Sequence, residues 1–458
     1  MGDISIQDYN NRIHLLQQIY FPTEVPDDDY EPYDERYLRK PLKNWEAYNL
    51  IIRGFLGTGL LLLPEAFRYS GVLVGIVDLV VVSIFVTHMY HLFMKSRITL
   101  CKILRVASLY YPQAMKFGFE AGPSCLRIFS PVIGIFVDML CFLNQLNYLC
   151  SYLWHMSHDL ERIFEIWYGQ DFDHHSYVLI LGPYLILAMC VTNLKVYAIF
   201  AVFSNVFTLV SLSMMIFYLT QDLPNFTLIP AFSAPSDHIL FFVPALYALQ
   251  SVPLVSTVEL NMLKGKDFLR IPGILCQSYA TLSIIYFVIG VLGYWRYEEK
   301  TVLLTHNMDV SSWLVKTSII LYFFGIYISY GLQGQIGIYV IWEHYLTLWI
   351  NLRWEFLKAL IEYIFRFSLF VILPMIVVIY LPTGMSLFLS IHGMCQAFLA
   401  IMFPALLDIS LRWKRKKFGS CYWMFIKDLL LICLSCCLLV LSGYHGYRFC
   451  MGHPGSNW

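Results

Sequence analysis

Residues 45–67 read WEAYNLIIRGFLGTGLLLLPEAF, and this stretch decides the fold. It is long and apolar enough to cross a membrane, yet Gly54, Gly57 and Gly59 interrupt its middle and Pro64 follows them. A continuous apolar helix satisfies all of its own backbone groups in lipid, so glycines at this depth favour an unwound segment whose free N–H and C=O groups line a cavity. The stretch therefore predicts a transmembrane helix that is broken at a solute site.

Glycines in a membrane segment can also serve close packing or nucleotide binding. Small residues often allow membrane helices to pack closely, without any break. A nucleotide-binding loop requires the spacing G-x-G-x-x-G after a strand, and neither feature is present. We favour the broken helix because a hydroxyl residue, Thr58, lies between two of the glycines and a proline follows.

The composition indicates that most of the chain lies in a membrane. Of its 458 residues, 58% are hydrophobic and only 14% are charged, which is typical of an all-α polytopic membrane protein. We predict an acidic, disordered cytosolic tail over residues 1–44, a transmembrane domain over 45–449 and a short non-cytosolic tail over 450–458. Because about 20 apolar residues span a bilayer, the apolar runs predict eleven helices: near 46–67, 71–94, 130–155, 177–193, 196–219, 239–259, 273–296, 313–342, 360–381, 383–407 and 426–449.

Lysine and arginine residues predict the orientation. With the N-terminus in the cytosol, 22 of them fall in cytosolic segments and 6 outside, as the positive-inside rule requires. The chain has one Asn-x-Ser/Thr sequon, at Asn225, which then lies outside the cytosol as a candidate glycosylation site. The sequence leaves the plasma membrane and the lysosomal or endosomal membrane equally open.

A weaker interruption recurs in the predicted helix over 239–259. Pro253 removes a backbone hydrogen bond inside an apolar run, which predicts either a second break or a kink in a continuous helix. Breaks in the first and sixth helices are typical of two inverted repeats of five helices with the solute site between them. The predicted substrate site then combines residues from both breaks: Gly54, Gly57, Thr58 and Gly59 with Tyr247, Gln250 and Ser251.

Three ionisable residues in the predicted spans are candidates for binding a coupling ion such as a proton. A charge at the bilayer centre costs about 2.5 to 3.5 kcal/mol, so Asp138, Glu65 and His392 are expected to face a cavity, lie near an interface or be neutral. Each could also have a purely structural role. Asp138 can form an interhelical hydrogen bond, Glu65 can lie at the interface and His392 can be a packing residue.

The sequence predicts neither an enzyme nor a metal centre. It contains no H-E-x-x-H motif, and no nucleophile and base stand at an informative spacing. Nearly all of its cysteines lie inside hydrophobic segments, as Cys433, Cys436 and Cys437 do, where thiols act as small hydrophobic side chains. We therefore expect no cofactor apart from a coupling proton. The expected partners are a small solute and the lipid bilayer, with no nucleic acid.

Several motifs together resemble one family. Gly54-x-x-Gly57-Thr58-Gly59-Leu60-Leu61-x-Leu63-Pro64 is similar to the first helix of the proton-coupled amino acid transporters, in the amino acid/auxin permease group. Further similar segments follow in order over about residues 40 to 449: Val137-Asp138, Gln145-Leu146, Asn193-Leu194-Lys195, Gly290 to Tyr294, Tyr330 to Gln333, Leu399 to Leu407 and Lys427-Asp428. Each segment is weak alone, but their order makes the resemblance specific.

The resemblance implies a LeuT-like transporter of eleven helices for small neutral amino acids, often coupled to a proton. This chain departs from the family pattern at two positions. Leu50 stands where proton-coupled members have a histidine, and Leu249-Gln250-Ser251 replaces the usual Phe-Glu-Gly of the sixth helix. Two natural proton carriers are therefore missing.

Two functions remain as hypotheses. The first is a secondary transporter that moves amino acids by alternating access. The second is an amino acid sensor that binds its ligand with little net transport and signals through the cytosolic tail. Binding without flux would distinguish the sensor from the transporter.

Overall fold

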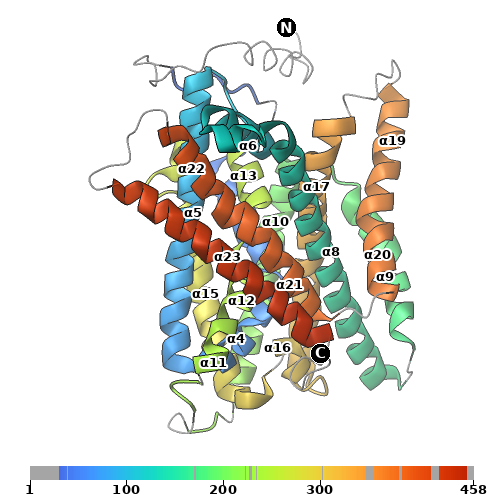
Figure 1. Ribbon diagram of the computed structural model, residues 1–458. Helices are drawn as coiled ribbons and strands as arrows, with labels where there is room; N and C mark the ends of the chain where they lie inside the picture. The colour runs from blue at the N-terminus through green and yellow to red at the C-terminus, as the bar shows by residue number, and fades with distance from the viewer. Residues whose placement is uncertain are drawn as a thin grey trace.

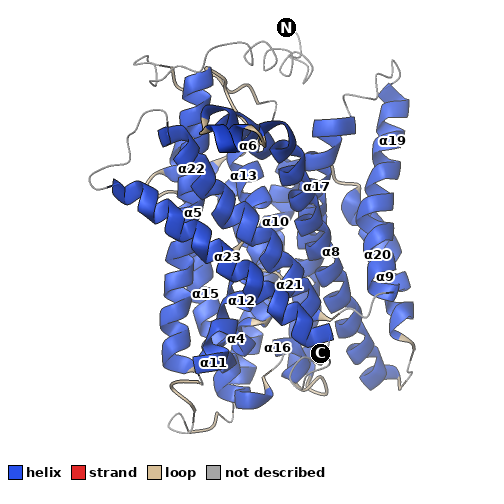
Figure 2. Cartoon of the chain, viewed as in Figure 1, coloured by secondary structure: helices blue, strands red, loops and turns tan. Residues whose placement is uncertain are grey.

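The computed structural model describes residues 30–38, 40–169, 172–221, 223–225, 229–233, 235–301, 303–346, 355–380, 384–413 and 422–450. Over these residues the protein is helical, and the only strand-like pairing is an isolated bridge between Leu42 and Met262 (Figure 2). The predicted all-α class is confirmed.

The first predicted helix is broken. Two residues, Leu56 and Gly57, separate α2 (Asn44–Phe55) from α3 (Thr58–Leu61), and α4 (Leu63–Ser70) follows α3. The helix axis bends by 49° between the part before the break and the part after it. Pro64 lies in the first turn of α4, where its missing N–H costs little.

The sixth predicted helix is also broken, and not merely kinked. α12 (Phe242–Leu249) and α13 (Val252–Leu260) are separated by Gln250 and Ser251, whose φ values of −120° and −154° belong to extended backbone. Pro253 stands in the first turn of α13 and therefore marks the start of the second piece.

The other helices follow the predicted order, with boundaries that differ by several residues. The long ones are α5 (Val72–Leu104), α8 (Ser130–Tyr168), α10 (Leu194–Leu219), α15 (Ile274–Tyr297), α17 (Trp313–Ile338), α19 (Glu355–Phe367) with α20 (Leu373–Tyr380), α21 (Met385–Gln396) with α22 (Phe403–Trp413), and α23 (Trp423–Cys450). The shorter ones are α6 (Tyr111–Ala121), α7 (Ser124–Arg127), α9 (His174–Met189), α11 (Pro235–His238), α14 (Lys266–Leu269) and α16 (Leu304–Asn307).

The number of spans is ten by length and hydropathy within the described residues. Nine segments pass, among them Ile239–Leu260, which includes both α12 and α13, and the bent pair of α2 with α3 and α4 adds one. α9 corresponds to the fourth predicted helix, but its 16 residues fall short of the about 20 that a bilayer needs. The count of eleven therefore stays a prediction.

The helices form one bundle in which the two broken helices are central (Figure 1). α12 contacts α3 and α4, α2 contacts α10, and α23 lies across α21 and α22. We call the end with α6 and the N-terminal segment the upper end, and the end with α11 and α16 the lower end, as they appear in Figure 1.

The described part of the N-terminal tail is attached to the bundle. Leu42 exchanges backbone hydrogen bonds with Asn261 (2.8 Å) and Leu263 (2.9 Å), just after α13. Arg36 Nε donates to the carbonyl of Ala107 at 3.2 Å. The expectation of disorder is therefore wrong for residues 30–38 and 40–43. Residues 1–29 and 39, and the C-terminal tail from 451, lie outside the described residues.

A buried ionic cluster fastens this tail to the second broken helix. Glu259, near the end of α13, pairs with Arg97 of α5, and its Oε1 lies 3.1 Å from Arg36 Nη1. Arg97 also donates to Ser256 Oγ at 2.8 Å. All three charged side chains are at most 5% exposed, so each charge depends on its partners for stabilisation.

Replacing Glu259 by Gln should lower the stability by about 3 to 5 kcal/mol, because it leaves two buried arginines without their counter-ion. Thermal unfolding of the purified protein in detergent measures this. Lys266→Ala is the control, since Lys266 pairs with Asp34 at the surface, and it should change little. Equal melting temperatures for both variants would contradict the importance of the cluster.

Candidate functional site

Side chains from other helices donate hydrogen bonds to the backbone carbonyls around the first break. Tyr286 of α15 places its hydroxyl 2.6 Å from the carbonyl oxygen of Phe55, and Tyr322 of α17 donates to that of Gly57 at 2.8 Å. Gln333 Nε2 donates to the carbonyl of Gly54 at 3.3 Å. The surrounding helices thus replace the hydrogen bonds that the break removes.

The second break is supported in the same way. The N–H of Ser251 donates to Tyr90 Oη at 2.8 Å, and Tyr148 donates to the carbonyl of Gln250 at 2.5 Å. Tyr279 donates to the carbonyl of Leu249 at 2.8 Å. Tyrosine suits this role because its hydroxyl reaches the backbone while its ring packs in the apolar bundle.

The two breaks lie directly against each other. The Tyr286 hydroxyl that meets α2 is also 2.9 Å from the carbonyl oxygen of Ala248 in α12. Gly59 approaches Ala248 so closely that a Cβ atom on Gly59 would be 2.6 Å from Ala248 Cα. A Cβ on Gly57 would be 2.7 Å from the hydroxyl oxygen of Tyr152. Both positions therefore need glycine for close approach.

Three hydroxyl groups join the breaks to α8. Thr58 Oγ1 is 3.0 Å from Tyr247 Oη and 3.2 Å from Ser151 Oγ, and Tyr247 donates to Ser151 at 2.6 Å. All three residues are buried. The structure thus brings together Thr58 and Tyr247, which the sequence predicted to share a site, and adds Ser151.

Two predicted site residues have polar side chains without a partner among the described residues. Gln250 and Ser251 are fully buried, yet neither the Gln250 amide nor the Ser251 hydroxyl forms a hydrogen bond. Buried polar groups are nearly always hydrogen-bonded, so an unbonded pair at one place points to a missing partner. A polar ligand at the second break would supply it.

Arg53 connects the end of α2 to two further helices. Its guanidinium donates to Ser204 (3.2 Å) and Thr208 (2.6 Å) of α10, to Ser329 (2.8 Å) of α17 and to the carbonyl of Leu56. Its side chain is fully buried, and no carboxylate of the described residues forms an ion pair with it. The first break therefore contains a fixed positive charge.

The candidates for ion coupling lie at different places. His392 of α21 is next to the site, with its ring centre 5.0 Å from that of Tyr148 and 4.9 Å from that of Tyr247. Asp138 is buried in α8, ten residues before Tyr148, which corresponds to about 15 Å along the helix axis. Only His392 is brought to the breaks.

Glu65 lies in the second half of the first helix, in α4, and has partners of its own. It accepts a hydrogen bond from Tyr69 at 2.9 Å and pairs with Arg68 at 3.4 Å. The residue is only 1% exposed, so it is enclosed by protein and not at an open surface. These contacts favour a structural role for Glu65.

The proposed glycosylation site is only partly described. Asn225 is exposed in the loop after α10, while Phe226 and Thr227 of the sequon lie outside the described residues. Its use for glycosylation stays a prediction.

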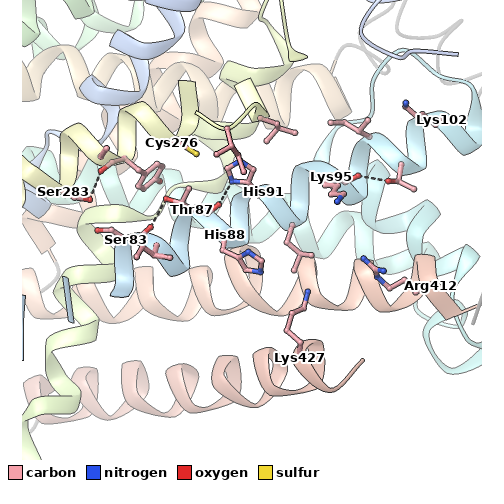
Figure 3. Close-up of a pocket in the computed structure, with 18 residues that line it drawn as sticks. Ser83, Thr87, His88, His91, Lys95, Lys102, Cys276, Ser283, Arg412 and Lys427 are labelled. Atoms are coloured by element: carbon pink, nitrogen blue, oxygen red, sulfur yellow. Dashed lines mark hydrogen bonds between the residues drawn. The ribbon is translucent and has the colours of Figure 1, made fainter. Parts of the chain in front are cut away.

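A groove of about 920 Å³ lies between α5 and α15 (Figure 3). It is lined by apolar residues of these helices and by cationic side chains, among them Lys95, Arg412 and Lys427. Tyr279, which donates to the carbonyl of Leu249, lines it too, but Leu56, Gly57, Gln250 and Ser251 do not. The groove is therefore separate from the unpartnered side chains at the second break.

The most important residues that sequence reasoning missed are the supporting tyrosines and Arg53. Tyr90, Tyr148, Tyr279, Tyr286 and Tyr322 come from four helices that are far apart in the chain. The only signal was the total of 32 tyrosines, which indicates neither position nor partner. Arg53 stood inside the decisive stretch, but its partners in α10 and α17 could not be assigned from the sequence.

Comparisons with known proteins agree with this architecture. The family described as "Transmembrane amino acid transporter protein" matches residues 40–448. This chain belongs to that family. A relative from Drosophila melanogaster, "Proton-coupled amino acid transporter-like protein pathetic", is 26% identical over 409 residues, which cover 87% of this chain and 83% of that protein. "Vacuolar amino acid transporter 3" of Schizosaccharomyces pombe is 23% identical over 63% of this chain and 42% of its own length.

Solved structures support the LeuT-like fold of this amino acid transporter family member. MHP1, a nucleobase-cation-symport-1 family transporter in a closed conformation with bromovinylhydantoin bound, has a TM-score of 0.53 at 10% identity and covers 92% of this chain and 96% of its own. A Na⁺-coupled sialic acid symporter in a substrate-bound outward-open state has the same score at 11% identity, over 96% and 98% of the two chains. At such identities the likeness concerns the fold alone.

Replacing Tyr322 by Phe should destabilise the protein by about 0.5 to 1.5 kcal/mol, because the carbonyl of Gly57 loses its hydrogen bond from the hydroxyl and retains only the longer one from the Leu60 N–H, at 3.3 Å. Thermal unfolding of the purified protein is the measurement. Tyr327→Phe is the matched control on the same helix, since its hydroxyl donates to the carbonyl of Tyr184 at an exposed position. An equal loss of stability in Tyr327→Phe would show that the hydrogen bond to Gly57 at the break stabilises the protein no more than one at an exposed position.

Proposed function

We propose that this protein moves small neutral amino acids across a membrane by alternating access at the two breaks. The observation that supports this most strongly is the pair of unpartnered polar side chains, Gln250 and Ser251, buried where the broken sixth helix meets the broken first helix. Both breaks are closed to solvent in this structure, as in a state between inward and outward access.

The chemistry at the first break suits a carboxylate. The helical segment Thr58–Ser70 begins at the break, and the first N–H groups of a helix have no acceptor within it. The helix dipole and the fixed charge of Arg53 both favour a negative group nearby. The carboxylate of an amino acid would balance the charge of Arg53.

The chemistry at the second break suits an ammonium group. Carbonyl and hydroxyl oxygens can accept its three hydrogen bonds, and Thr58, Tyr247 and Ser251 place such oxygens at the breaks. Close contacts of Gly57 with Tyr152 and of Gly59 with Ala248 leave little space, which favours a small side chain on the substrate.

The orientation and the second function also remain proposals. The positive-inside bias places the upper end, with the N-terminal tail, in the cytosol. The sensor hypothesis gains support from one observation, the ion pair between Arg36 of the tail and Glu259 of α13. Through this contact a change at the second break could reach the tail.

The transport proposal is tested by uptake of labelled amino acids into proteoliposomes. We expect saturable uptake by the unaltered protein, competition by other small amino acids, and no competition by the matching amines that lack a carboxylate. Gly57→Trp should abolish uptake because its side chain would occupy the position of Tyr152. Gly443→Ala is the control, since its added Cβ would meet only Met394 at 3.4 Å.

Two outcomes would contradict the proposal, one for the site and one for transport. Uptake that persists unchanged in Gly57→Trp would exclude the first break as the site. Amino acid binding by a folded protein without any uptake would favour the sensor.

For proton coupling we propose His392, the one candidate beside the site. If uptake is stimulated by acid, His392→Asn should remove the stimulation while uptake at neutral pH is largely retained. Comparing uptake at acidic and neutral pH measures this. Stimulation that survives in His392→Asn but is lost in Asp138→Asn would assign the proton to Asp138 instead.

A further inference from the structure

A cluster of imidazoles and carboxylates lies at the lower end of the bundle, apart from the breaks (Figure 1). His155 and Asp159 are one turn apart on α8, and His155 Nε2 is 3.0 Å from Asp159 Oδ2. His306 of α16 faces them from a segment almost 150 residues later in the chain. One ligand atom from each of the three residues lies within 4.8 Å of the others.

His155 and Asp159 are buried, His306 is partly buried, and all three side chains are incompletely bonded. His155 is 0% exposed and Asp159 is 2% exposed. His155 Nδ1, Asp159 Oδ1 and His306 Nε2 have no hydrogen-bond partner within the described part of the chain. Unsatisfied buried polar atoms of this kind are costly unless a ligand completes them. His306 is only partly buried as a residue, although its Nε2 atom is enclosed.

We propose that His155, Asp159 and His306 bind a divalent transition metal such as Zn²⁺. Two imidazoles and a carboxylate are typical Zn²⁺ ligands, and hard ions such as Ca²⁺ and Mg²⁺ prefer oxygen alone. Two ligands of a tetrahedral Zn²⁺ are roughly 3.3 Å apart, close to the separation of His155 from Asp159. Water can occupy the fourth position.

The environment agrees with this assignment. Arg162 is the nearby positive charge, but its two amino groups are engaged with the carbonyls of Thr305 and Met308 at 2.6 and 3.0 Å. The carboxylate of Asp159 offsets that charge.

A second group of three ligands adjoins the first. His158 and His174 lie 3.1 and 3.0 Å from Glu161, and their rings stack at 3.9 Å. All three residues are partly exposed and already bonded to one another. We therefore assign the metal to the buried group, whose atoms lack partners.

The sequence predicted no metal site, because these three ligands form no short motif. His155-x-x-x-Asp159 provides two ligands on one helical face, but the third ligand comes from α16. Only the tertiary fold brings α16 against α8. A metal here would join these two elements at the lower end, so its binding should slow any transport that requires them to separate.

The test uses the purified full-length protein, stripped with a chelator and titrated with Zn²⁺ alone by calorimetry. Co²⁺ absorption spectra give an independent readout of the coordination. We expect one site, with affinity reduced at least about tenfold in His306→Gln and in Asp159→Asn. His175→Gln is the control, because His175 is exposed and belongs to neither group, and it should bind as the unaltered protein does. Melting temperatures without metal verify that each variant is folded.

Two results would overturn the proposal. One is the absence of Zn²⁺ binding at micromolar concentrations. The other is binding that is unchanged in folded His306→Gln but lost in His174→Gln, which would place the metal in the second group. The effect on uptake rests on the proposed transport function, whereas metal binding is measured without transport, so the two proposals can fail separately.

Discussion

In a bilayer every backbone N–H and C=O group needs a partner from the protein, and this requirement governs the structure. Two central helices are interrupted, at Leu56-Gly57 and at Gln250-Ser251, and each interruption exposes backbone groups that a continuous helix would satisfy. The bundle meets the requirement with side chains from neighbouring helices. Most of these are tyrosines, whose hydroxyl groups reach the breaks from α5, α8, α15 and α17.

This arrangement ties the breaks to one another. Tyr286 contacts a carbonyl oxygen of each broken helix, and Gly59 allows the backbone of α12 to come close. Arg53 then adds a buried positive charge that is bonded only to neutral oxygen atoms. These contacts hold the backbone on both sides of the breaks. The side chains of Gln250 and Ser251 still lack hydrogen-bond partners among the described residues, and a polar solute could bind there.

The sequence was most informative where the cause of the structure is local. Glycines near Thr58 disrupt a helix through their own backbone chemistry, so the first break could be predicted from a short stretch. Pro253 indicated either a break or a kink, and the structure decided for a break. The helix order was also predictable, because hydrophobic length depends on the bilayer and not on neighbours. The attachment of residues 30–38 and 40–43 was missed, because an acidic stretch looks disordered until Arg36 meets Glu259.

By itself the sequence determined the fold class, the family and the interrupted first helix, and it limited the sixth helix to a break or a kink, since composition, periodicity and backbone breakers act within a single segment. Only the tertiary structure decided which residues surround the breaks. It placed His392 beside Tyr148 and Tyr247, left Asp138 about 15 Å along the helix from that level, and joined His306 to His155. These relations depend on the packing of helices that are distant in the chain, and no local pattern encodes which faces will meet.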